Sequence, residues 1–342
     1  MRDVVAIGST TLDLFFKTRF DIIRWPTTPL GKALVVPLGE KFGIEDVHIT
    51  IGGNAANAAV TFARQGFSCA LFTKIGNDIA GREVLRTLRR EHVGATLVEV
   101  TPRRRTSQSI LLLQKGERSI ITYHGAIDEF TLRRVRLDAL KAAWWYVSLP
   151  GDSYKAFDRL LSYATRHGIK VALNPSYKHL VGAGRQQLVK HLKKLALLVL
   201  NEGEAALLTG IPFRNEKKVF KVLDDMVPGI VAVTQGQKGS MVSDGHHLYH
   251  ARIFKEHNLA DRTGAGDAFG AGFVAGLVRT GEQCAKGTCN PRSISYALRL
   301  ASANAASVIE RIGATEGTLT RKQFETSSRW RRFPISVKKI KA

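Results

Sequence analysis

A glycine-rich stretch in the last third of the chain carries the strongest chemical signal. Residues 261–267 read Asp-Arg-Thr-Gly-Ala-Gly-Asp, and small residues at helical spacing follow them to residue 276. A glycine-rich turn at the start of a helix leaves unpaired N–H groups at the positive end of the helix dipole, where phosphate oxygens bind well. Asp267 stands at the same turn, where a carboxylate suits the removal of a proton from an attacking hydroxyl. The stretch therefore predicts phosphoryl transfer to an alcohol, and the alternative is an ordinary helix capped by Asp267.

Two common nucleotide-binding loops do not fit this stretch. A Walker A loop needs Gly-Lys followed by Ser or Thr, whereas Gly266 is followed by Asp267. A dinucleotide-binding fingerprint needs a glycine where Phe269 stands. The pattern therefore excludes both loops.

The elements that must position this turn alternate along the chain. Strand patterns are expected at residues 4–8, 68–75, 144–149, 170–173, 195–200 and 230–234, and helical patterns at 55–65 and 83–91. This alternation predicts an α/β fold, a doubly wound and mostly parallel sheet flanked by helices. Binding loops are then expected at the carboxyl ends of the strands.

Two segments interrupt the alternation. One is about 16–51, which contains three prolines, and the other is about 101–124, where β-rich runs at 109–114 and 119–123 flank a Lys-Gly-Glu-Arg loop. The second is typical of a β-hairpin. Together the segments predict a small inserted β-sheet that acts as a lid over a cleft, and the alternative is a surface hairpin without a function.

Composition and charge limit the class of protein. Lys and Arg number 51 against 29 Asp and Glu, a net charge of +22, and 44% of residues are hydrophobic. This is a globular composition, and its charge fits either a nucleic-acid binder or an enzyme that handles phosphorylated anions. No apolar run approaches the roughly 18 residues of a membrane span, and no signal-peptide pattern begins the chain. Cys69, Cys284 and Cys289 do not make a disulfide framework, which favours a cytoplasmic location.

The last 22 residues are strongly basic. Residues 321–342 contain eight Lys or Arg and one Glu, and residues 329–333 read Arg-Trp-Arg-Arg-Phe. Such a run can contact RNA by stacking and by binding phosphates. The alternatives are a solvated tail or a Trp packed on the domain surface. The sequence thus predicts a main domain over 1–320, which contains both lid segments, and a basic tail over 321–342.

The motifs in combination resemble those of the ribokinase-like (PfkB) carbohydrate kinase family. Residues 261–267 resemble its second signature, and residues 52–57, Gly-Gly-Asn-Ala-Ala-Asn, resemble the first, about 210 residues earlier. Residues 201–204 fit an Asn-x-x-Glu motif, and residues 234–239 fit a Thr-x-Gly-x-x-Gly turn. The resemblance spans residues 4 to about 320. It implies a ribokinase-like fold and the transfer of the γ-phosphoryl group of ATP to a hydroxyl of a small sugar.

The resemblance also implies roles for particular residues. Asp267 would be the base, and the N–H groups of Gly264, Ala265 and Gly266 would hold the developing charge. The implied substrate-binding residues are Asp13, Gly52, Gly53 and Asn57, and the implied nucleotide-binding residues are Asn201, Thr234, Gly236, Gly239 and Asn304. Glu204 would orient Mg²⁺ through water, and Asp261 would belong to a site for a monovalent cation such as K⁺.

Three departures from the family pattern keep the substrate open. Asn54 and Thr11 stand where ribokinases proper have Lys and Asn, and Arg262 stands where many members have Thr. The Arg262 guanidinium would either touch ATP phosphates or point to solvent. The candidates are a sugar kinase, an adenosine-like nucleoside kinase on the same fold, and a nucleic-acid-binding protein with a kinase-like fold. The resemblance also suggests a homodimer joined through the lid, and no membrane partner is expected.

Overall fold

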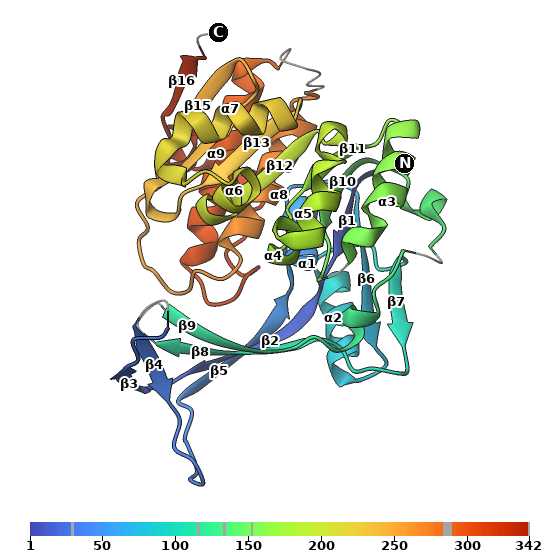
Figure 1. Cartoon of the computed structure of the whole chain (residues 1–342). Helices are drawn as coiled ribbons and strands as arrows, with labels where there is room; N and C mark the ends of the chain where they lie inside the picture. The colour runs from blue at the N-terminus through green and yellow to red at the C-terminus, as the bar shows by residue number, and fades with distance from the viewer. Residues whose placement is uncertain (29–30, 115–116, 133–134, 152, 283–288, 341–342) are drawn as a thin grey trace.

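A ten-stranded sheet forms the centre of the computed structural model (Figure 1), which describes residues 1–342 except 29–30, 115–116, 133–134, 152, 283–288 and 341–342. In order across the sheet the strands are β16 (Ile335–Lys339), β15 (His247–Ala251), β14 (Ser240–Ser243), β13 (Ile230–Thr234), β12 (Leu197–Asn201), β11 (Lys170–Leu173), β10 (Ala142–Ser148), β1 (Arg2–Gly8), β6 (Cys69–Gly76) and β7 (Val98–Thr101). From β13 to β7 neighbouring strands pair in parallel, and β14 to β16 extend the sheet by antiparallel pairing. The predicted, mostly parallel sheet is confirmed.

Helices cover both faces of this sheet. They are α1 (Asn54–Arg64), α2 (Ile79–Arg90), α3 (Phe157–Arg166), α4 (Tyr177–Leu180), α5 (Gly182–Val189), α6 (Glu202–Thr209), α7 (Glu216–Met226), α8 (Ala265–Arg279), α9 (Pro291–Ile309), α10 (Arg321–Thr326) and α11 (Ser328–Arg331). Strand side chains alternate between faces, so Val4 and Ala6 of β1 join the core with α1, α8 and α9, whereas Val5 and Ile7 join the core with α3, α5, α6 and α7. Burial on both faces explains why the strands read as continuous apolar runs.

A second, four-stranded sheet projects from the body (Figure 1) and confirms the predicted insertion. Its order is β5 (Asp46–Gly52), β2 (Thr11–Lys17), β8 (Gln108–Gln114) and β9 (Glu117–Tyr123), and β3 (Asp21–Arg24) pairs with β4 (Lys32–Val35) in a separate hairpin. The predicted hairpin is the antiparallel pair β8–β9, although positions 115–116 of its loop lie outside the described residues. The lid sheet also extends beyond the predicted segment 16–51, because β2 already begins at Thr11.

The start of α2 differs from its prediction. The helix begins at Ile79 rather than at residue 83, because the Asp78 carboxylate accepts a hydrogen bond from the Gly81 N–H at 2.8 Å and caps it. Ile79 is 77% exposed, so it breaks the pattern of one apolar helix face. Strands β11 and β13 have the expected bounds, whereas β1, β6, β10, β12 and α1 differ from theirs by one or two residues at an end.

The basic C-terminal residues are part of the fold, which corrects the prediction of a separate tail. Strand β16 pairs with β15 from His247–Lys339 to Ala251–Ile335. Trp330 is only 5% exposed and belongs to the main core cluster. The sequence left open RNA contact, a solvated tail or a Trp packed on the domain, and the structure shows the last of these. The Trp330 ring is therefore not available to stack on RNA.

The cysteines differ from one another. Cys69 is a buried free thiol, and burial raises its pKa to about 12, so it stays protonated at neutral pH. Cys289 is disulfide-bonded, which the cysteine count did not predict, and Cys284 lies outside the described residues. Within the described ranges, no helix has the length and apolar character needed to cross a bilayer.

Candidate active site

The first turn of α8 confirms that the glycine-rich stretch opens a helix. Gly264 precedes it in the left-handed conformation, with φ 77°, and a Cβ at this position would come within 2.6 Å of the Ala314 Cβ. Ala265, Gly266 and Asp267 form the first turn, where N–H groups have no carbonyl partner within the helix. Ala265 and Gly266 line a cavity. The predicted anion site therefore opens onto a pocket.

Asp267 faces the other way, toward α1. Its side chain is 9% exposed, and the Asn57 Nδ2 donates a hydrogen bond to its Oδ2 at 2.9 Å. Burial raises the pKa of Asp267 to about 6; the hydrogen bond from Asn57 opposes this rise, and the charges of Glu204 and Asp13 add to it. The carboxylate is thus ionised at neutral pH but more basic than an exposed aspartate, as a general base should be.

Asp13 lies on the lid strand β2, where the lid joins the body. It is 5% exposed, and its Oδ1 accepts a hydrogen bond from the Thr11 hydroxyl at 2.6 Å. Burial raises its pKa, and hydrogen bonds from Thr11 and Ser109 oppose that rise. A Cβ at Gly52 would lie 1.8 Å from the Asp13 Oδ2, and Gly53 has φ 90°, so glycine is required at both positions. The structure thus brings the predicted acceptor residues together.

Asn201 and Glu204 form a capping box at the start of α6. The Glu204 N–H donates to the Asn201 Oδ1 at 2.9 Å, and the Asn201 N–H donates to the Glu204 Oε2 at 2.8 Å. Burial raises the pKa of Glu204, and its charge reaches Asp267. The Glu204 Oε2 therefore caps the start of α6, and the role of Glu204 in binding Mg²⁺ stays a prediction.

Asp261 is a buried carboxylate with one unsatisfied oxygen. It is 2% exposed, and its Oδ1 accepts hydrogen bonds from the Thr263 N–H at 3.0 Å and hydroxyl at 2.8 Å. Its Oδ2 has no hydrogen-bond partner among the described residues. A buried oxygen in this state is suited to a cation, because an unpaired buried charge is otherwise costly.

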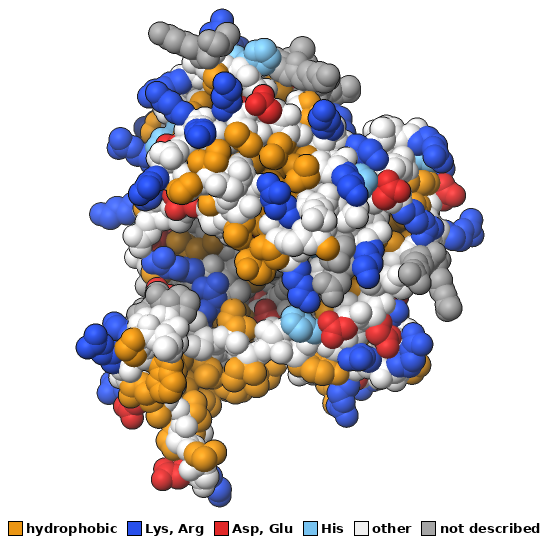
Figure 2. Space-filling model, in the orientation of Figure 1, with side chains coloured by type: hydrophobic (Ala, Val, Ile, Leu, Met, Phe, Trp, Pro, Cys, Tyr) orange, Lys and Arg blue, Asp and Glu red, His pale blue; other side chains and the backbone are white. Residues whose placement is uncertain are grey.

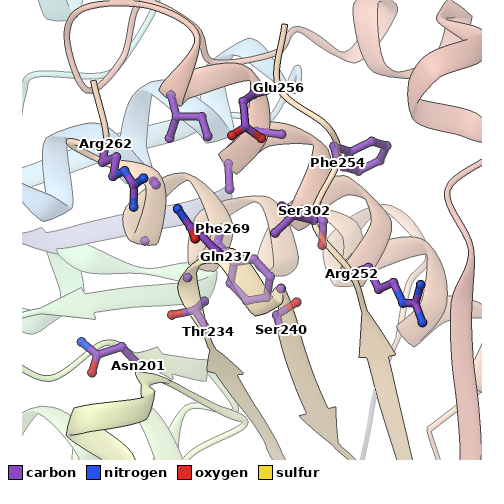
Figure 3. A pocket seen from close by; sticks show the side chains of 18 of the residues that line it. Asn201, Thr234, Gln237, Ser240, Arg252, Phe254, Glu256, Arg262, Phe269 and Ser302 are labelled. Carbon is purple, nitrogen blue, oxygen red and sulfur yellow. The ribbon is translucent and has the colours of Figure 1, made fainter. Parts of the chain in front are cut away.

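The cavity has a volume of about 410 Å³ and lies between the ends of β12 to β14, the 252–262 loop, α8 and α9. Four of the five predicted nucleotide-binding residues line it: Asn201, Thr234, Gly236 and Gly239. In the view of Figure 3, Asn201, Thr234 and Arg262 lie on one side of the pocket, and Arg252 and Phe254 lie on the other. The motifs thus meet at one cavity, although 38 residues separate Asn201 from Gly239 in the chain.

Sequence reasoning missed most of the wall of this cavity. Phe254, Glu256 and Ser302 line it, and they belong to no motif. Their only sequence signal is their position: Phe254 and Glu256 follow β15, and Ser302 lies on α9, the helix after α8. Arg262 also lines the cavity, so the structure excludes the alternative in which its side chain points to bulk solvent. Its Nε is buried without a partner among the described residues.

Asn304 was predicted to bind the nucleotide, and this prediction is corrected because Asn304 does not line the cavity. Its side chain is fully buried. The Nδ2 donates to the Ala268 carbonyl at 2.9 Å, and the Oδ1 accepts from the Leu319 N–H at 2.9 Å. These bonds satisfy both ends of the amide, so Asn304 ties α9 to α8 and to the following loop instead of binding a nucleotide.

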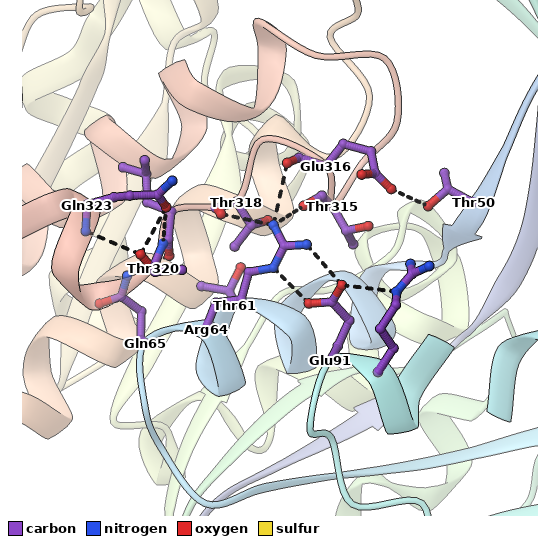
Figure 4. A network of polar contacts seen from close by, with 12 residues as sticks. Thr50, Thr61, Arg64, Gln65, Glu91, Thr315, Glu316, Thr318, Thr320 and Gln323 are labelled. Atoms are coloured by element: carbon purple, nitrogen blue, oxygen red, sulfur yellow. Dashed lines mark hydrogen bonds and ion pairs between the residues drawn. The ribbon is translucent and has the colours of Figure 1, made fainter. Parts of the chain in front are cut away.

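A polar network fixes the same loop against α1 and the lid (Figure 4). The Arg64 guanidinium pairs with Glu91 at 2.8 and 3.0 Å and donates to the Thr315 and Thr318 carbonyls at 2.9 and 3.0 Å. The Thr50 hydroxyl of β5 donates to a carboxylate oxygen of Glu316 at 3.1 Å. Ala314, which packs against Gly264, lies in this loop, so the network supports the start of α8.

Comparisons with known proteins agree with this geometry. Residues 1–321 match the model of the pfkB family carbohydrate kinases. The chain is similar to a ribokinase of Staphylococcus aureus, with 29% identity over 290 residues that cover 82% of this chain and 88% of the relative. It is also similar to a cytidine kinase of Thermococcus kodakarensis, with 26% identity over 283 residues that cover 82% and 90%.

The fold has close structural neighbours. The structure of Arabidopsis thaliana ribokinase complexed with ribose and ATP matches with a TM-score of 0.73 and 21% identity, and covers 94% of this chain and 97% of that one. At this identity the likeness concerns the fold alone. The predicted ribokinase-like architecture is confirmed.

Proposed function

The chain belongs to the pfkB family of carbohydrate kinases, and we propose that it transfers the γ-phosphoryl group of ATP to a hydroxyl of a small sugar, with Asp267 as the general base. The position of Asp267 carries the proposal. It is buried with a pKa of about 6, and it contacts Asn57 on the acceptor side. The neighbouring Ala265 and Gly266 line the cavity. Phosphoryl transfer needs this combination of positioning and charge stabilisation.

The proposed reaction follows from these contacts. The acceptor oxygen attacks the γ-phosphorus, the bond between that phosphorus and the β,γ-bridging oxygen breaks, and ADP leaves. The proton of the acceptor hydroxyl goes to Asp267, which the hydrogen bond from Asn57 holds in place. The N–H groups of Gly264, Ala265 and Gly266 hold the charge on the transferring group.

Asp13 is the proposed acceptor-binding residue, because a buried carboxylate hydrogen-bonds strongly to adjacent hydroxyls. The surrounding charges favour a neutral acceptor: Asp13, Asp261 and Asp267 interact electrostatically, which would repel a phosphorylated or carboxylated sugar. Asn54 also adds no positive charge there, because its side chain is a neutral amide; its Nδ2 donates to the Ser148 hydroxyl at 3.2 Å. A neutral polyol or sugar fits this setting best.

The carboxylates Glu204 and Asp261 also fit the two cations proposed for this reaction, Mg²⁺ and a monovalent cation. Mg²⁺ keeps most of its waters and needs few protein ligands, so Glu204, beside the charge of Asp267, would hold it through water. When bound, Mg²⁺ neutralises charge on the ATP phosphates. The unsatisfied Oδ2 of Asp261 supports a monovalent-cation site.

Arg262 is the proposed contact to the ATP phosphates. It lines the cavity together with Ala265 and Gly266, and its Nε lacks a partner among the described residues. A guanidinium in this position would pair with phosphate oxygens.

A substrate panel tests the proposal. Formation of ADP is measured with ATP, Mg²⁺ and a series of pentoses, hexoses, keto-deoxy acids and nucleosides, with the Asp267→Asn protein as the matched control. We expect turnover with a neutral sugar that the control lacks. The similarity to a cytidine kinase supports the nucleoside alternative, and turnover of nucleosides alone would replace the sugar. Absence of acceptor-dependent ADP across the panel would contradict both.

We also propose that the lid joins two copies of the chain. One face of its sheet carries cross-strand neighbours that are all apolar, Ile49, Leu14, Ile110 and Ile121, and the outer two are 54% and 61% exposed. Figure 2 shows hydrophobic side chains gathered on the lid. The same face on a second copy is an apolar surface of equal extent, and pairing would cover both.

Light scattering tests this assembly. Ile49→Asp is expected to convert a dimer into a monomer. Leu207→Asp serves as the control, since Leu207 is also exposed, at 40%, but lies on α6. A wild-type monomer, or a dimer that survives the Ile49 change, would contradict the proposal.

A further inference from the structure

One wall of the nucleotide cavity is a loop without regular structure. Residues 252–262 form no helix or strand. Six of them line the cavity: Arg252, Ile253, Phe254, Glu256, Leu259 and Arg262. Backbone hydrogen bonds of a helix or sheet do not hold such a loop, so its shape depends on contacts with other parts of the molecule.

Two aromatic rings from the C-terminal segment pack on this loop. Phe254 is 6% exposed; the Phe333 ring stacks on it with centroids 3.7 Å apart, and the Trp330 ring meets it edge-on at 4.9 Å. Aromatic pairs of this kind contribute stability beyond the area they bury. Phe254 therefore lines the cavity, and its ring packs against both C-terminal rings.

Polar contacts hold the backbone of the same loop. The Arg329 guanidinium donates to the Lys255 carbonyl at 2.9 Å and to both carboxylate oxygens of Glu310 at 2.6 and 3.1 Å. Glu310 in turn accepts a hydrogen bond from the His257 N–H at 2.8 Å. Burial would raise the pKa of Glu310, but the bonds from Arg329 and His257 outweigh it and lower the pKa, so the pair stays charged. Arg329 also lies over the Trp330 ring, 4.1 Å from its centroid.

The segment that supplies these contacts lies beyond the family match, which ends at residue 321. Its strand β16 runs along β15 up to the pair Ala251–Ile335, next to the first residue of the loop. The segment 328–339, which contains α11 and β16, is thus fixed to the sheet at one end and to the loop at the other. We call residues 328–339 the C-terminal brace.

We propose that the C-terminal brace holds the 252–262 loop in the shape that binds ATP, with Trp330 and Arg329 as positioning residues. The inference rests on the proposed function only in taking the cavity as the nucleotide site. If the loop is already ordered before binding, nucleotide binding does not have to include the entropic cost of ordering it. The brace therefore raises nucleotide affinity without contacting the ligand. Loss of a brace contact is expected to weaken ATP and ADP binding and to leave acceptor binding unchanged.

The test measures ADP binding by calorimetry and, separately, KM for ATP and for the acceptor. Trp330→Ala is expected to weaken ADP binding and to raise KM for ATP by about 5- to 10-fold, the effect of losing one aromatic contact and the order it imposes. Trp330→Phe keeps a ring and is expected to stay within about twofold of the wild type. Lys338→Ala, at an exposed position of β16, is the matched control and is expected to change nothing.

Arg329→Met provides a second variant, in case Trp330→Ala does not fold. It keeps an apolar stem beside Trp330 but loses the bonds to Glu310 and Lys255, and we expect ADP binding about 3- to 5-fold weaker. Either folded variant overturns the proposal if it binds ADP like the wild type, or if its KM for the acceptor rises as much as its KM for ATP. Calorimetry needs no turnover, so a wild type that binds no ADP would count against the nucleotide site itself.

Discussion

At the proposed acceptor end of the site, short side chains from the lid and α1 hydrogen-bond to buried carboxylates, whereas at the proposed nucleotide end a loop forms one wall of a cavity of about 410 Å³. Asp13 and Asp267 are at most 9% exposed. The residues of the proposed nucleotide end line a cavity, and Phe254 in its wall packs against Trp330 from the C-terminal segment.

The contrast indicates where each kinetic parameter is determined. In the proposed function, buried carboxylates in fixed geometry act on the acceptor and its proton, so changes there should alter kcat or the KM for the acceptor. The cavity wall is proposed to act on the nucleotide alone, so changes there should alter the KM for ATP.

The largest effect is expected from Asp267→Asn. The amide keeps the shape but cannot take a proton, so kcat should fall by roughly 10²- to 10⁴-fold, with ADP affinity nearly unchanged. Steady-state kinetics and calorimetry measure the two quantities. Turnover equal to that of the wild type would contradict the role of base.

The stability of the same variant separates a base from a helix cap. Burial raises the pKa of Asp267 to about 6, so the ionised form is disfavoured in the folded state. As pH rises from the pKa of the unfolded chain, near 4, to the folded pKa of about 6, ionisation of Asp267 lowers the stability of the folded state. Above pH 6 this loss of stability is complete. Asp267→Asn should therefore melt at or above the wild-type temperature at pH 7.5. A clear drop would indicate a capping role instead.

Asp13→Ala is expected to raise KM for the acceptor by about 10- to 100-fold, because it removes charge-assisted hydrogen bonds to hydroxyls. KM for ATP should change by less than about twofold, since Asp13 lies on the lid strand rather than at the cavity. Asp21→Ala, at an exposed position of β3, is the control. A change in KM for ATP alone would reverse the assignment of the two ends.

Acid should inactivate the enzyme through Asp267. The base works only when ionised, so kcat/KM should fall about tenfold for each pH unit below its pKa of about 6. Asp224 on α7 also has a pKa raised to about 6 by burial, but it bonds to Ser243 outside the cavity lining. Asp224→Asn should keep the acid limb of the profile. Loss of that limb in the Asp224 variant would contradict the assignment to Asp267.

The smallest effect is expected from Arg262→Thr, which installs the residue that many family members have. Loss of the guanidinium should raise KM for ATP by about fivefold and leave KM for the acceptor unchanged. Arg252→Ala is the matched control, because Arg252 also lines the cavity but lies on the opposite side in Figure 3. An equal effect of both changes would indicate general charge attraction rather than a phosphate contact.

Much of the fold follows from local patterns in the sequence. Apolar runs place β11 and β13 at their observed bounds, and the glycine-rich stretch places the start of α8. These signals are local because burial on both faces, helical spacing and turn chemistry act over a few neighbouring residues. The start of α2 was not predicted for the same reason. Ile79 is exposed, so the apolar pattern does not reach the first residues of the helix that Asp78 caps.

The site shows where local patterns stop. The types and spacing of residues determined the turn that holds Asp267 and the motif that supplies Asn57, but their contact joins positions 210 residues apart and depends on the packing of α8 on α1. Only the tertiary structure turned Asn304 into the core, placed Arg262 in the cavity and docked Trp330 on Phe254. The physical reason is that a side chain's chemistry is set by its type, whereas its partners are set by which surfaces the whole chain buries together.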